Sequence, residues 1–408
     1  MNLTRDTPVE TALDAVREWT EINVPRSWLD AGRRGGAAAV RAVRTRAEYE
    51  AWYPVFAASG LVVPTWPVPY GGLDLTVPVA RAIETELRPY NLGRLNPLGL
   101  NNTASALFAY GTEEQRLRFL PPMVRNEEKW CQLFSEPGAG SDLASLACRA
   151  ELDGETWIVT GQKVWTTWAH TSDFAVLLAR TDPEVPKRQG ITYFLLDLHQ
   201  AGVEVRPLRH IGGEVDFNEV FLDGAVVPDS MRVGAVGAGW KVAAATLSGE
   251  RQMVSGAGSG GVDRIGGRGA EHLFALARAS GAKCGPVVRQ ELMRVYSEER
   301  IRDWTNQRVR AQVKAGRAPG PESSVGKVHQ ADLNQRIQLC AMTLLGARAA
   351  AWEGDVPWEV RGMLRSRANT IEGGTTEVNK NIVGERVLGL PREPDPWQGA
   401  PWRDIPRS

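Results

Sequence analysis

Residues 131–145 read CQLFSEPGAGSDLAS, and this stretch says most about the fold of the chain. Its centre, Pro137–Ser141, exposes backbone N–H groups and lets a ligand approach the backbone closely. The stretch GQKVWTT follows at Gly161–Thr167, where a tryptophan beside two threonines suits a flat heteroaromatic ring with polar rim atoms. For each stretch taken alone, an ordinary turn on a β domain is the favoured interpretation.

Short runs rich in β-branched and aromatic residues surround both stretches, and Gly, Pro and Asp separate these runs. We expect strands at residues 157–160, 174–179, 191–196, 203–207 and 219–222. On either side the apolar residues recur with helical period. We expect helices at residues 7–24, 46–59, 78–90, 96–110, 240–254, 270–279, 287–314, 324–352 and 358–387.

This order of helices, then strands, then helices predicts an α+β fold with segregated layers rather than an alternating parallel sheet. The predicted domains are an N-terminal helical domain (1–125), a central β domain (126–235) and a C-terminal helical bundle (236–390), followed by an extended tail (391–408). A length of 408 residues agrees with two to three domains at about 150 residues each.

Composition excludes several classes of function. Lys plus Arg and Asp plus Glu both number 48, so the formal net charge is zero and a generic binder of nucleic acid is not expected. The four cysteines have no C-x-x-C spacing and the five histidines form no H-x-x-x-H pair, so we expect no metal site. The sparse cysteines, the charged residues within 1–20 and the lack of a long apolar run predict a cytoplasmic protein without signal peptide or membrane span.

Residues Gly256–Gly261, GAGSGG, match the dinucleotide-binding pattern G-x-G-x-x-G, but we reject this assignment. The fingerprint must follow a strand, open a helix and precede an acidic residue by about 20 positions. Here the preceding residues 247–254 have helical character and no such acidic residue follows. We interpret these glycines instead as a helix face of small residues that packs closely on another helix.

Taken together, three signatures resemble those of the acyl-CoA dehydrogenase family of flavoenzymes. They are Ser135–Asp142 (SEPGAGSD), Gly161–Thr167 (GQKVWTT) and Ile371–Ile382 (IEGGTTEVNKNI). The resemblance covers nearly the whole chain, because the order of helices and strands also agrees. It implies an N-terminal helical domain, a central β domain and a C-terminal four-helix bundle that enclose FAD.

The resemblance also implies which residues bind ligands. Leu133, Phe134 and Ser135 are expected to line the flavin, with Trp165 and Thr167 against its ring. The full set of expected FAD contacts is Leu133, Phe134, Ser135, Gly140, Ser141, Trp165, Thr167, Arg278, Gly346, Thr375 and Glu377. The expected acyl-CoA contacts are Ser141, Arg251, Gly373 and Gly374. Thr375 has a second interpretation as a helix N-cap, and one residue can serve both purposes.

The family reaction is α,β-dehydrogenation of an acyl-CoA, in which a carboxylate removes the α-proton while the β-hydrogen leaves as hydride to flavin N5. Many members carry that carboxylate in the third signature, where this chain has Gly373. A second branch places it in a Glu-Arg pair on an earlier helix, and this chain has Glu250-Arg251 there. We therefore expect Glu250 to be the base, with Glu372 as the alternative. The non-functional interpretation of Glu250-Arg251 is a solvated ion pair on a helix face.

One departure from the family pattern concerns the segment that reaches the FAD of a neighbouring subunit. Its counterpart, Ala277–Gly281, is degenerate, with Arg278 displaced by one position and Ser280 in place of an aromatic residue. A homo-oligomer (dimer or tetramer) and a heterotetramer with a paralogue both stay open, as does a subunit that needs a partner for its FAD site. A flavin-dependent oxidase or monooxygenase of the same fold is a further alternative.

Substrate and electron acceptor rest on the resemblance. The resemblance to actinobacterial members points to bulky or sterol-derived acyl chains and to an electron-transfer flavoprotein as acceptor. Small residues around Glu250, such as Ser248, Gly249 and Ser255, agree with a wide substrate.

Overall fold

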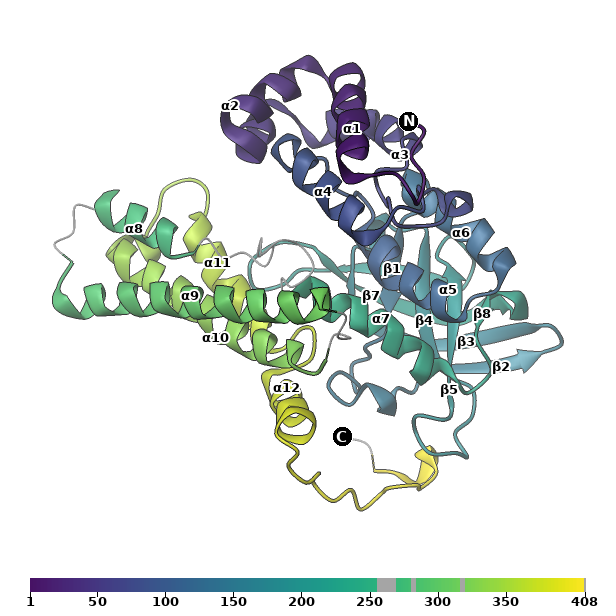
Figure 1. Cartoon of the computed structure of the whole chain (residues 1–408). Coiled ribbons are helices and arrows are strands. Elements are labelled where there is room, and N and C mark those ends of the chain that lie inside the picture. Colours follow the sequence, from purple (N-terminus) through teal and green to yellow (C-terminus); the bar gives the residue numbers. More distant parts are fainter. Residues whose placement is uncertain (255–268, 280–283, 316–319, 407–408) are drawn as a thin grey trace.

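Helices at both ends of the chain flank a central β-sheet (Figure 1). The computed structural model describes residues 1–254, 269–279, 284–315 and 320–406, without the side chains of 248–254, 310, 313 and 314. Within these ranges, the helices lack the combination of length and apolar character that crossing a membrane requires.

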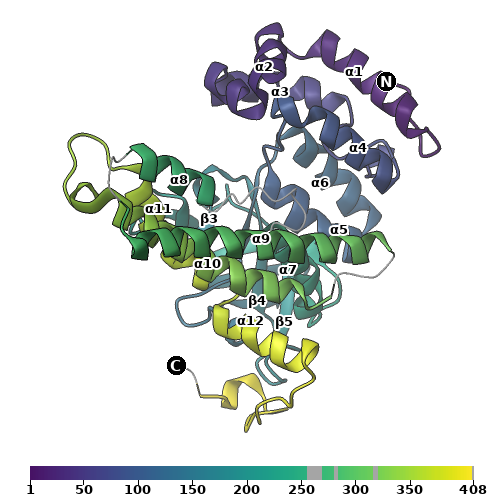
Figure 2. The same cartoon turned by 60° about the vertical axis from the view of Figure 1, so that its left-hand side comes forward.

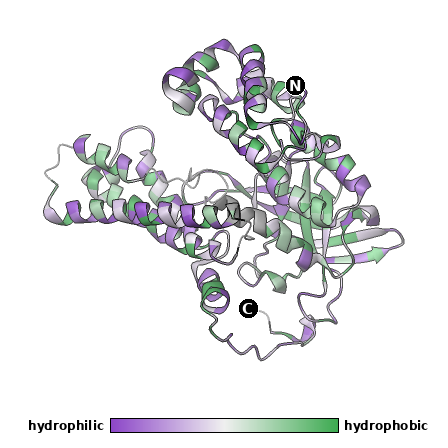
Figure 3. Cartoon of the chain, in the orientation of Figure 1, coloured by the Kyte–Doolittle hydropathy of each residue, from purple (hydrophilic) through white to green (hydrophobic). Residues whose placement is uncertain are grey.

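Capping interactions begin two of the N-terminal helices. Thr45 and Thr112 each accept a hydrogen bond from the backbone N–H three residues on, while the side chain at that position bonds back to the threonine N–H. The helices of this part are α1 (Val9–Asn23), α2 (Arg26–Val43), α3 (Arg46–Ala58), α4 (Val77–Leu87), α5 (Ala104–Tyr110) and α6 (Glu113–Arg125). Figure 3 shows hydrophilic and hydrophobic residues alternating along these helices.

Helix α2 was not expected from the sequence. Its sequence contains the run Gly32–Gly36 (GRRGG), and glycine and arginine interrupt the apolar pattern. The structure resolves this conflict with a kink, because Gly35 and Gly36 are non-helical and Gly36 has a φ of 62°. The expected segment at 96–110 is likewise divided, into a π-helical stretch (Leu98–Thr103) and α5.

The β domain is an eight-stranded sheet with the order β6-β7-β3-β2-β4-β5-β8, and β1 pairs with β4. Its strands are β1 (Trp130–Leu133), β2 (Arg149–Asp153), β3 (Thr156–Thr167), β4 (Phe174–Arg180), β5 (Ile191–Asp197), β6 (Val203–Leu208), β7 (Phe217–Pro228) and β8 (Arg232–Val233). The five expected strands are present, whereas β1, β2 and β8 were not expected. These three strands are two to five residues long and carry little periodic signal.

Both faces of the central strands are buried. Successive residues of a strand point to opposite faces of the sheet, so neighbouring residues belong to different cores. Val176 and Leu178 of β4 join the core shared with the N-terminal helices and α7, whereas Leu177 belongs to a second core built from strand residues. Burial on both faces explains why β4 and β5 are continuous apolar runs. The second core contains residues of β2, β3 and β7, so the sheet bends over onto itself.

The C-terminal part packs α8, α9 and α10 around a third core, which includes Leu273, Val295 and Ile337. Figure 2 shows α9 and α10 side by side. The helices are α7 (Gly239–Val254), α8 (Ala270–Ala279), α9 (Pro286–Lys314), α10 (Ser323–Leu345), α11 (Trp358–Ser366) and α12 (Thr376–Ile382).

For two C-terminal helices, the predicted range extends beyond the helix in the structure. The helix expected at 324–352 ends at Leu345, because Gly346 adopts a left-handed φ of 58°. The helix expected at 358–387 is broken between α11 and α12, where Gly373 and Gly374 have φ values of 63° and 84°. Glycine adopts such angles at little cost, so the pair ends one helical segment and reorients the next.

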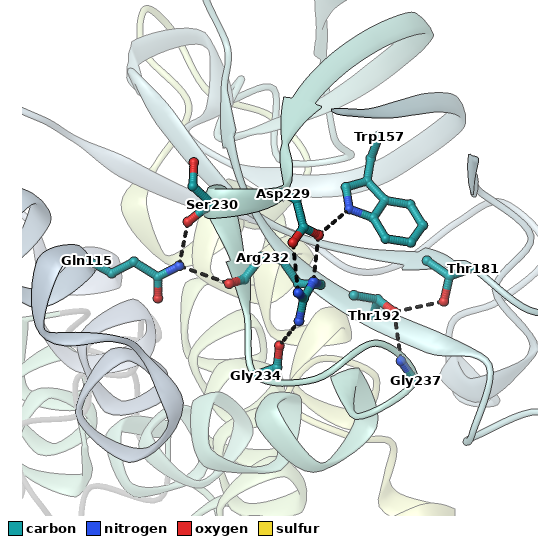
Figure 4. A network of polar contacts seen from close by, with 9 residues as sticks. All are labelled: Gln115, Trp157, Thr181, Thr192, Asp229, Ser230, Arg232, Gly234 and Gly237. Carbon is teal, nitrogen blue, oxygen red and sulfur yellow. Dashed lines mark hydrogen bonds and ion pairs between the residues drawn. The ribbon is translucent and has the colours of Figure 1, made fainter. Parts of the chain in front are cut away.

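A polar network joins the N-terminal helices to the rim of the sheet (Figure 4). The side-chain amide of Gln115 on α6 donates to the carbonyl oxygens of Ser230 (2.8 Å) and Arg232 (2.9 Å). Asp229 accepts from Arg232 (2.8 Å) and from the Trp157 indole (2.7 Å), and these two bonds lower its pKa to about 2. Residues 229–232, which precede α7, are thereby fixed both to α6 and to β3 of the sheet.

Candidate active site

A buried ion pair fastens the glycine-rich stretch to β3. Lys163 is fully buried, and its Nζ lies 2.8 Å from Glu136 Oε1 and 3.1 Å from the carbonyl oxygen of Phe134. Glu136 also accepts hydrogen bonds from the backbone N–H groups of Ala147 (2.6 Å) and Cys148 (2.9 Å). The Glu136 carboxylate and the Lys163 ammonium are both hydrogen-bonded, and their partners lie on either side of residues 137–146. The network therefore holds this loop at both of its ends.

A β-bulge presents Trp165 to solvent beside this loop. The β3–β7 register shifts between Lys163 and Thr166, and Trp165 has a φ of 60°. A left-handed φ is costly for a bulky residue and is a recurrent feature of functional sites. The bulge leaves the indole 56% exposed, while the adjacent Val164 N–H donates to the carbonyl oxygen of Ser135 (3.0 Å). The first two signatures therefore meet at the C-terminal end of β3.

The C-terminal end of β3 fits the flat cofactor that the sequence predicts. The hydroxyl of Thr166 is buried with no hydrogen-bond partner among the described residues, although a buried hydroxyl normally has one. Gly138 and Gly140 have no positive φ, and a Cβ atom at either position would meet nothing within 4 Å. The folded chain itself therefore has no need of glycine there, whereas a ligand lying on the backbone would need it.

The third signature forms a tight turn ahead of α12. Thr375 is the N-cap, as expected, and its hydroxyl accepts from the Val378 N–H at 3.1 Å. Just before the turn, Glu372 is bound through both oxygens, to Arg365 (2.8 Å) and to the Asn369 side-chain amide (3.0 Å). Each oxygen of the Glu372 carboxylate is therefore engaged in one such contact.

Phe217 links the third signature to the other two. Its ring lies 5.8 Å from the Trp165 ring, edge to face, and the Arg365 guanidinium lies 5.8 Å from its centroid. Arg365 is the residue that binds Glu372, and its Nη1 atom is buried with no hydrogen-bond partner in the described part of the chain. The fold therefore brings all three signatures into one cluster.

A buried polar face of α10 supports this turn and was missed in the sequence. Lys327 donates to the carbonyl oxygen of Asn369, and the Asn334 amide donates to the Asn369 side-chain oxygen at 2.6 Å. Burial lowers the pKa of Lys327. The residues on this face recur at helical spacing and are Lys327, Gln330, Asn334 and Gln338. Polar residues at that spacing normally face solvent, so the sequence carries no sign that this face is buried.

Helix α7 carries the predicted base and is hydrogen-bonded to β5 of the sheet. Thr246 of α7 hydrogen-bonds with the buried Tyr193 hydroxyl at 3.0 Å, and the Tyr193 ring packs edge to face on Phe134 at 6.1 Å. Glu250 and Arg251 lie on this helix, but their side chains are outside the described residues, as is the rejected motif at 256–261.

Several predicted ligand residues lie at or near the cluster. Leu133 and Phe134 are buried, Ser135 and Thr167 are half-buried, and Gly140 and Ser141 are exposed. Next to Ser141, the Asp142 carboxylate accepts from Lys187 (2.7 Å) and Ser145 (2.6 Å). Burial raises the pKa of Asp142, but these bonds and the nearby positive charges outweigh it, so the net pKa is lowered.

The remaining predicted residues lie on the C-terminal helices. Arg278 is exposed on the last turn of α8, and the remainder of its segment, 280–283, is outside the described residues. Gly346 ends α10, and its left-handed φ already explains the glycine. Glu377 is exposed in the first turn of α12. Within the described residues, no group of three His, Cys, Asp or Glu side chains is arranged to hold a metal.

Comparison with known proteins identifies the family. The N-terminal, middle and C-terminal domains of acyl-CoA dehydrogenases match residues 14–127, 131–225 and 237–388. The chain belongs to the acyl-CoA dehydrogenase family. It is therefore an oxidoreductase, and the three matched segments follow the order of the helical, β and helical parts of the fold.

Two similar proteins come from Mycobacterium tuberculosis. The acyl-CoA dehydrogenase IpdE1 is 37% identical over 393 residues, which cover 94% of this chain and 98% of that protein. The acyl-CoA dehydrogenase FadE34 is 39% identical over 338 residues, which cover 82% of this chain and 45% of that protein.

Similar solved structures include two complexes of paired chains. The Tcur3481-Tcur3483 steroid ACAD has a TM-score of 0.73 at 26% identity and covers 96% of this chain and 100% of its own. The ChsE4-ChsE5 complex from Mycobacterium tuberculosis has a TM-score of 0.68 at 26% identity and covers 95% of this chain and 99% of its own. The acyl-CoA dehydrogenase family is a family of flavoproteins, so FAD is the expected cofactor.

Proposed function

We propose that this protein is an FAD-dependent acyl-CoA dehydrogenase that acts on bulky, steroid-derived acyl-CoA thioesters. The observation that carries the proposal is the meeting of the three signatures, with Trp165 exposed on a strained bulge between the Ser135–Asp142 loop and Arg365. Similarity to the steroid ACAD supports the substrate class. When bound, FAD supplies the hydride acceptor.

The residues of the chain that would hold FAD are those around the bulge. The Trp165 indole offers an aromatic surface, and the Thr166 hydroxyl and Arg365 Nη1 are buried groups that still have hydrogen-bonding capacity. Ser141 and Gly140 would meet the polar parts of the ligands, and Gly373 and Gly374 would line the acyl-CoA from the turn before α12. The predicted contacts Thr375 and Glu377 belong to the same turn.

We assign removal of the α-proton to Glu250. Position 250 follows Thr246 by four residues, about one turn of α7, and the Thr246–Tyr193–Phe134 contacts connect that helix to the glycine-rich stretch. The alternative base, Glu372, has both oxygens engaged by Arg365 and Asn369, which supports Glu250. Arg251 is proposed to orient the base or the acyl-CoA.

An anaerobic titration of the purified yellow protein tests this function. Acyl-CoA thioesters with steroid-type and linear chains are added in turn, and the absorption of the oxidised flavin is followed. We expect bleaching by steroid-type thioesters at lower concentration than by linear ones. Bleaching by short linear chains alone would overturn the substrate class. Bound flavin that no acyl-CoA reduces, with oxygen consumed in the absence of another acceptor, would favour an oxidase instead.

A partner subunit is the second part of the proposal. The neighbouring steroid ACAD and ChsE4-ChsE5 structures are complexes of two different chains. In this chain α9 exposes several large apolar side chains, which agrees with a covered face: Val287, Met293, Tyr296, Ile301 and Trp304. Arg278 is also exposed, where the family pattern expects a contact with the FAD of another subunit.

Expression alone and together with a paralogous chain, followed by mass measurement in solution, separates the two assemblies. A yellow homo-oligomer from this chain alone would contradict the need for a paralogue. A colourless protein that turns yellow only when co-expressed would support it.

We propose an electron-transfer flavoprotein as the electron acceptor. Reduction of that flavoprotein by this protein in the presence of acyl-CoA tests the proposal.

A further inference from the structure

The C-terminal segment of the chain returns to the β domain and docks there (Figure 1). Residues 401–404, here named the C-terminal strap, pair with the loop after β4. The N–H groups of Trp402 and Arg403 donate to the carbonyl oxygens of Val185 (2.9 Å) and Pro183 (3.1 Å), and Arg403 forms an ion pair with Glu184 at 2.7 Å. Trp402 is 8% exposed in a tail that is otherwise mostly exposed.

Trp402 covers a buried arginine. The guanidinium of Arg180, at the end of β4, lies 4.4 Å from the centroid of the Trp402 ring. Arg180 is 4% exposed and donates to the carbonyl oxygens of Ala144 (2.7 Å), Leu146 (3.0 Å) and Lys187 (3.0 Å). A charge buried against carbonyl dipoles is stabilised further by an aromatic face that excludes water.

The same contacts fix the segment that carries Ser141. The Trp402 indole N–H donates to the carbonyl oxygen of Ser145 at 3.3 Å, and the Ser145 hydroxyl donates to Asp142 at 2.6 Å. Lys187, whose carbonyl binds Arg180, donates to the same carboxylate at 2.7 Å. The C-terminal strap therefore closes a ring of contacts around residues 141–146.

We propose that Trp402 is a positioning residue for the ligand site, which acts through Arg180 to hold residues 141–146 in the geometry that binds acyl-CoA. The proposal rests on the proposed function, because it takes Ser141 as a ligand contact. In this role Trp402 acts on the ligand only through residues 141–146. Its loss would weaken binding, since the free segment samples many conformations, while the chemical step at the flavin would proceed at nearly the same rate once the substrate is bound.

Two variants at one position and one matched control test the proposal in the full-length protein. Trp402→Ala removes both the ring and the indole N–H, whereas Trp402→Phe keeps a ring over Arg180. Trp397→Ala removes an exposed tryptophan from the same tail and is the control. Hydrogen exchange at the Ser145 and Leu146 amides is measured first, without ligand, and then kcat and KM for the acyl-CoA that best reduces the flavin.

We expect exchange about tenfold faster and KM about tenfold higher in Trp402→Ala, with kcat within about twofold of the parent, since one desolvated cation–π contact is lost. Trp402→Phe should lie between, and Trp397→Ala should match the parent. Unchanged exchange in Trp402→Ala, unchanged KM despite faster exchange, a loss confined to kcat, or equal effects of Trp397→Ala would each overturn the proposal. Failure of the proposed function shows separately, as a parent protein that no acyl-CoA reduces.

Discussion

Replacement of Lys163 by methionine should destabilise the protein severely. The substitution removes the ammonium group that lies 2.8 Å from Glu136 and 3.1 Å from the Phe134 carbonyl oxygen, and it leaves a carboxylate that is only 9% exposed without its cation. Removal of one partner of a buried pair costs about 3–5 kcal/mol, because the remaining charge stays desolvated. We therefore expect the free energy of unfolding in urea to fall by that amount.

The control is Arg46→Met, which breaks an exposed pair with Glu50 at 2.7 Å on α3 and should cost under about 1 kcal/mol. The double variant Lys163→Met/Glu136→Gln removes the stranded charge as well, so it should recover at least about 1 kcal/mol of the loss. The reasoning would be refuted by a Lys163→Met variant that loses no more stability than Arg46→Met.

Three further outcomes follow from the described contacts. The pKa of Asp229, about 2, lies below the ordinary value, so its charged form stabilises the fold above about pH 4 and this contribution is lost as the pH falls through about 2. Asp229→Asn should thus lower the free energy of unfolding by about 1 kcal/mol at neutral pH, since solvent screens the half-exposed side chain, and urea titrations at pH 3 should show a smaller difference from the parent. Trp165→Ala should weaken FAD binding at least tenfold in a fluorescence titration while it changes the stability of the flavin-free protein by less than about 1 kcal/mol, because the ring is 56% exposed; unchanged FAD affinity would exclude the ring from the site. Gly346→Ala should cost about 1–3 kcal/mol in thermal unfolding because of its φ of 58°, whereas Gly384→Ala, whose added Cβ would meet only Leu390 at 3.7 Å, should be neutral or slightly stabilising.

The layered architecture could be predicted from the sequence because periodicity and burial agree in most of the chain. The strands expected at 174–179 and 191–196 are present as β4 and β5, whose apolar runs are typical of strands buried on both faces. Agreement fails where backbone geometry depends on glycine. The sequence around Gly36 hid a helix, and the pair Gly373-Gly374 divides what its periodicity predicted as one helix.

The contacts that build the site were less accessible to the sequence than its motifs. Glu136 and Lys163 stand within the first two signatures, but nothing in their spacing shows that they form a buried pair. Arg365 and Phe217 belong to no signature, and only the fold brings them between Trp165 and Glu372. Long-range pairs of this kind depend on tertiary packing, which neither composition nor periodicity encodes.

The assignment of the base is tested most directly by flavin bleaching in two variants compared side by side. Glu250→Gln and Glu372→Gln are loaded with FAD and titrated anaerobically with the acyl-CoA that best reduces the parent protein. We expect no bleaching in Glu250→Gln and bleaching close to the parent level in Glu372→Gln. Bleaching that persists in Glu250→Gln and disappears in Glu372→Gln, with FAD still bound to both, would contradict the mechanism proposed for this protein.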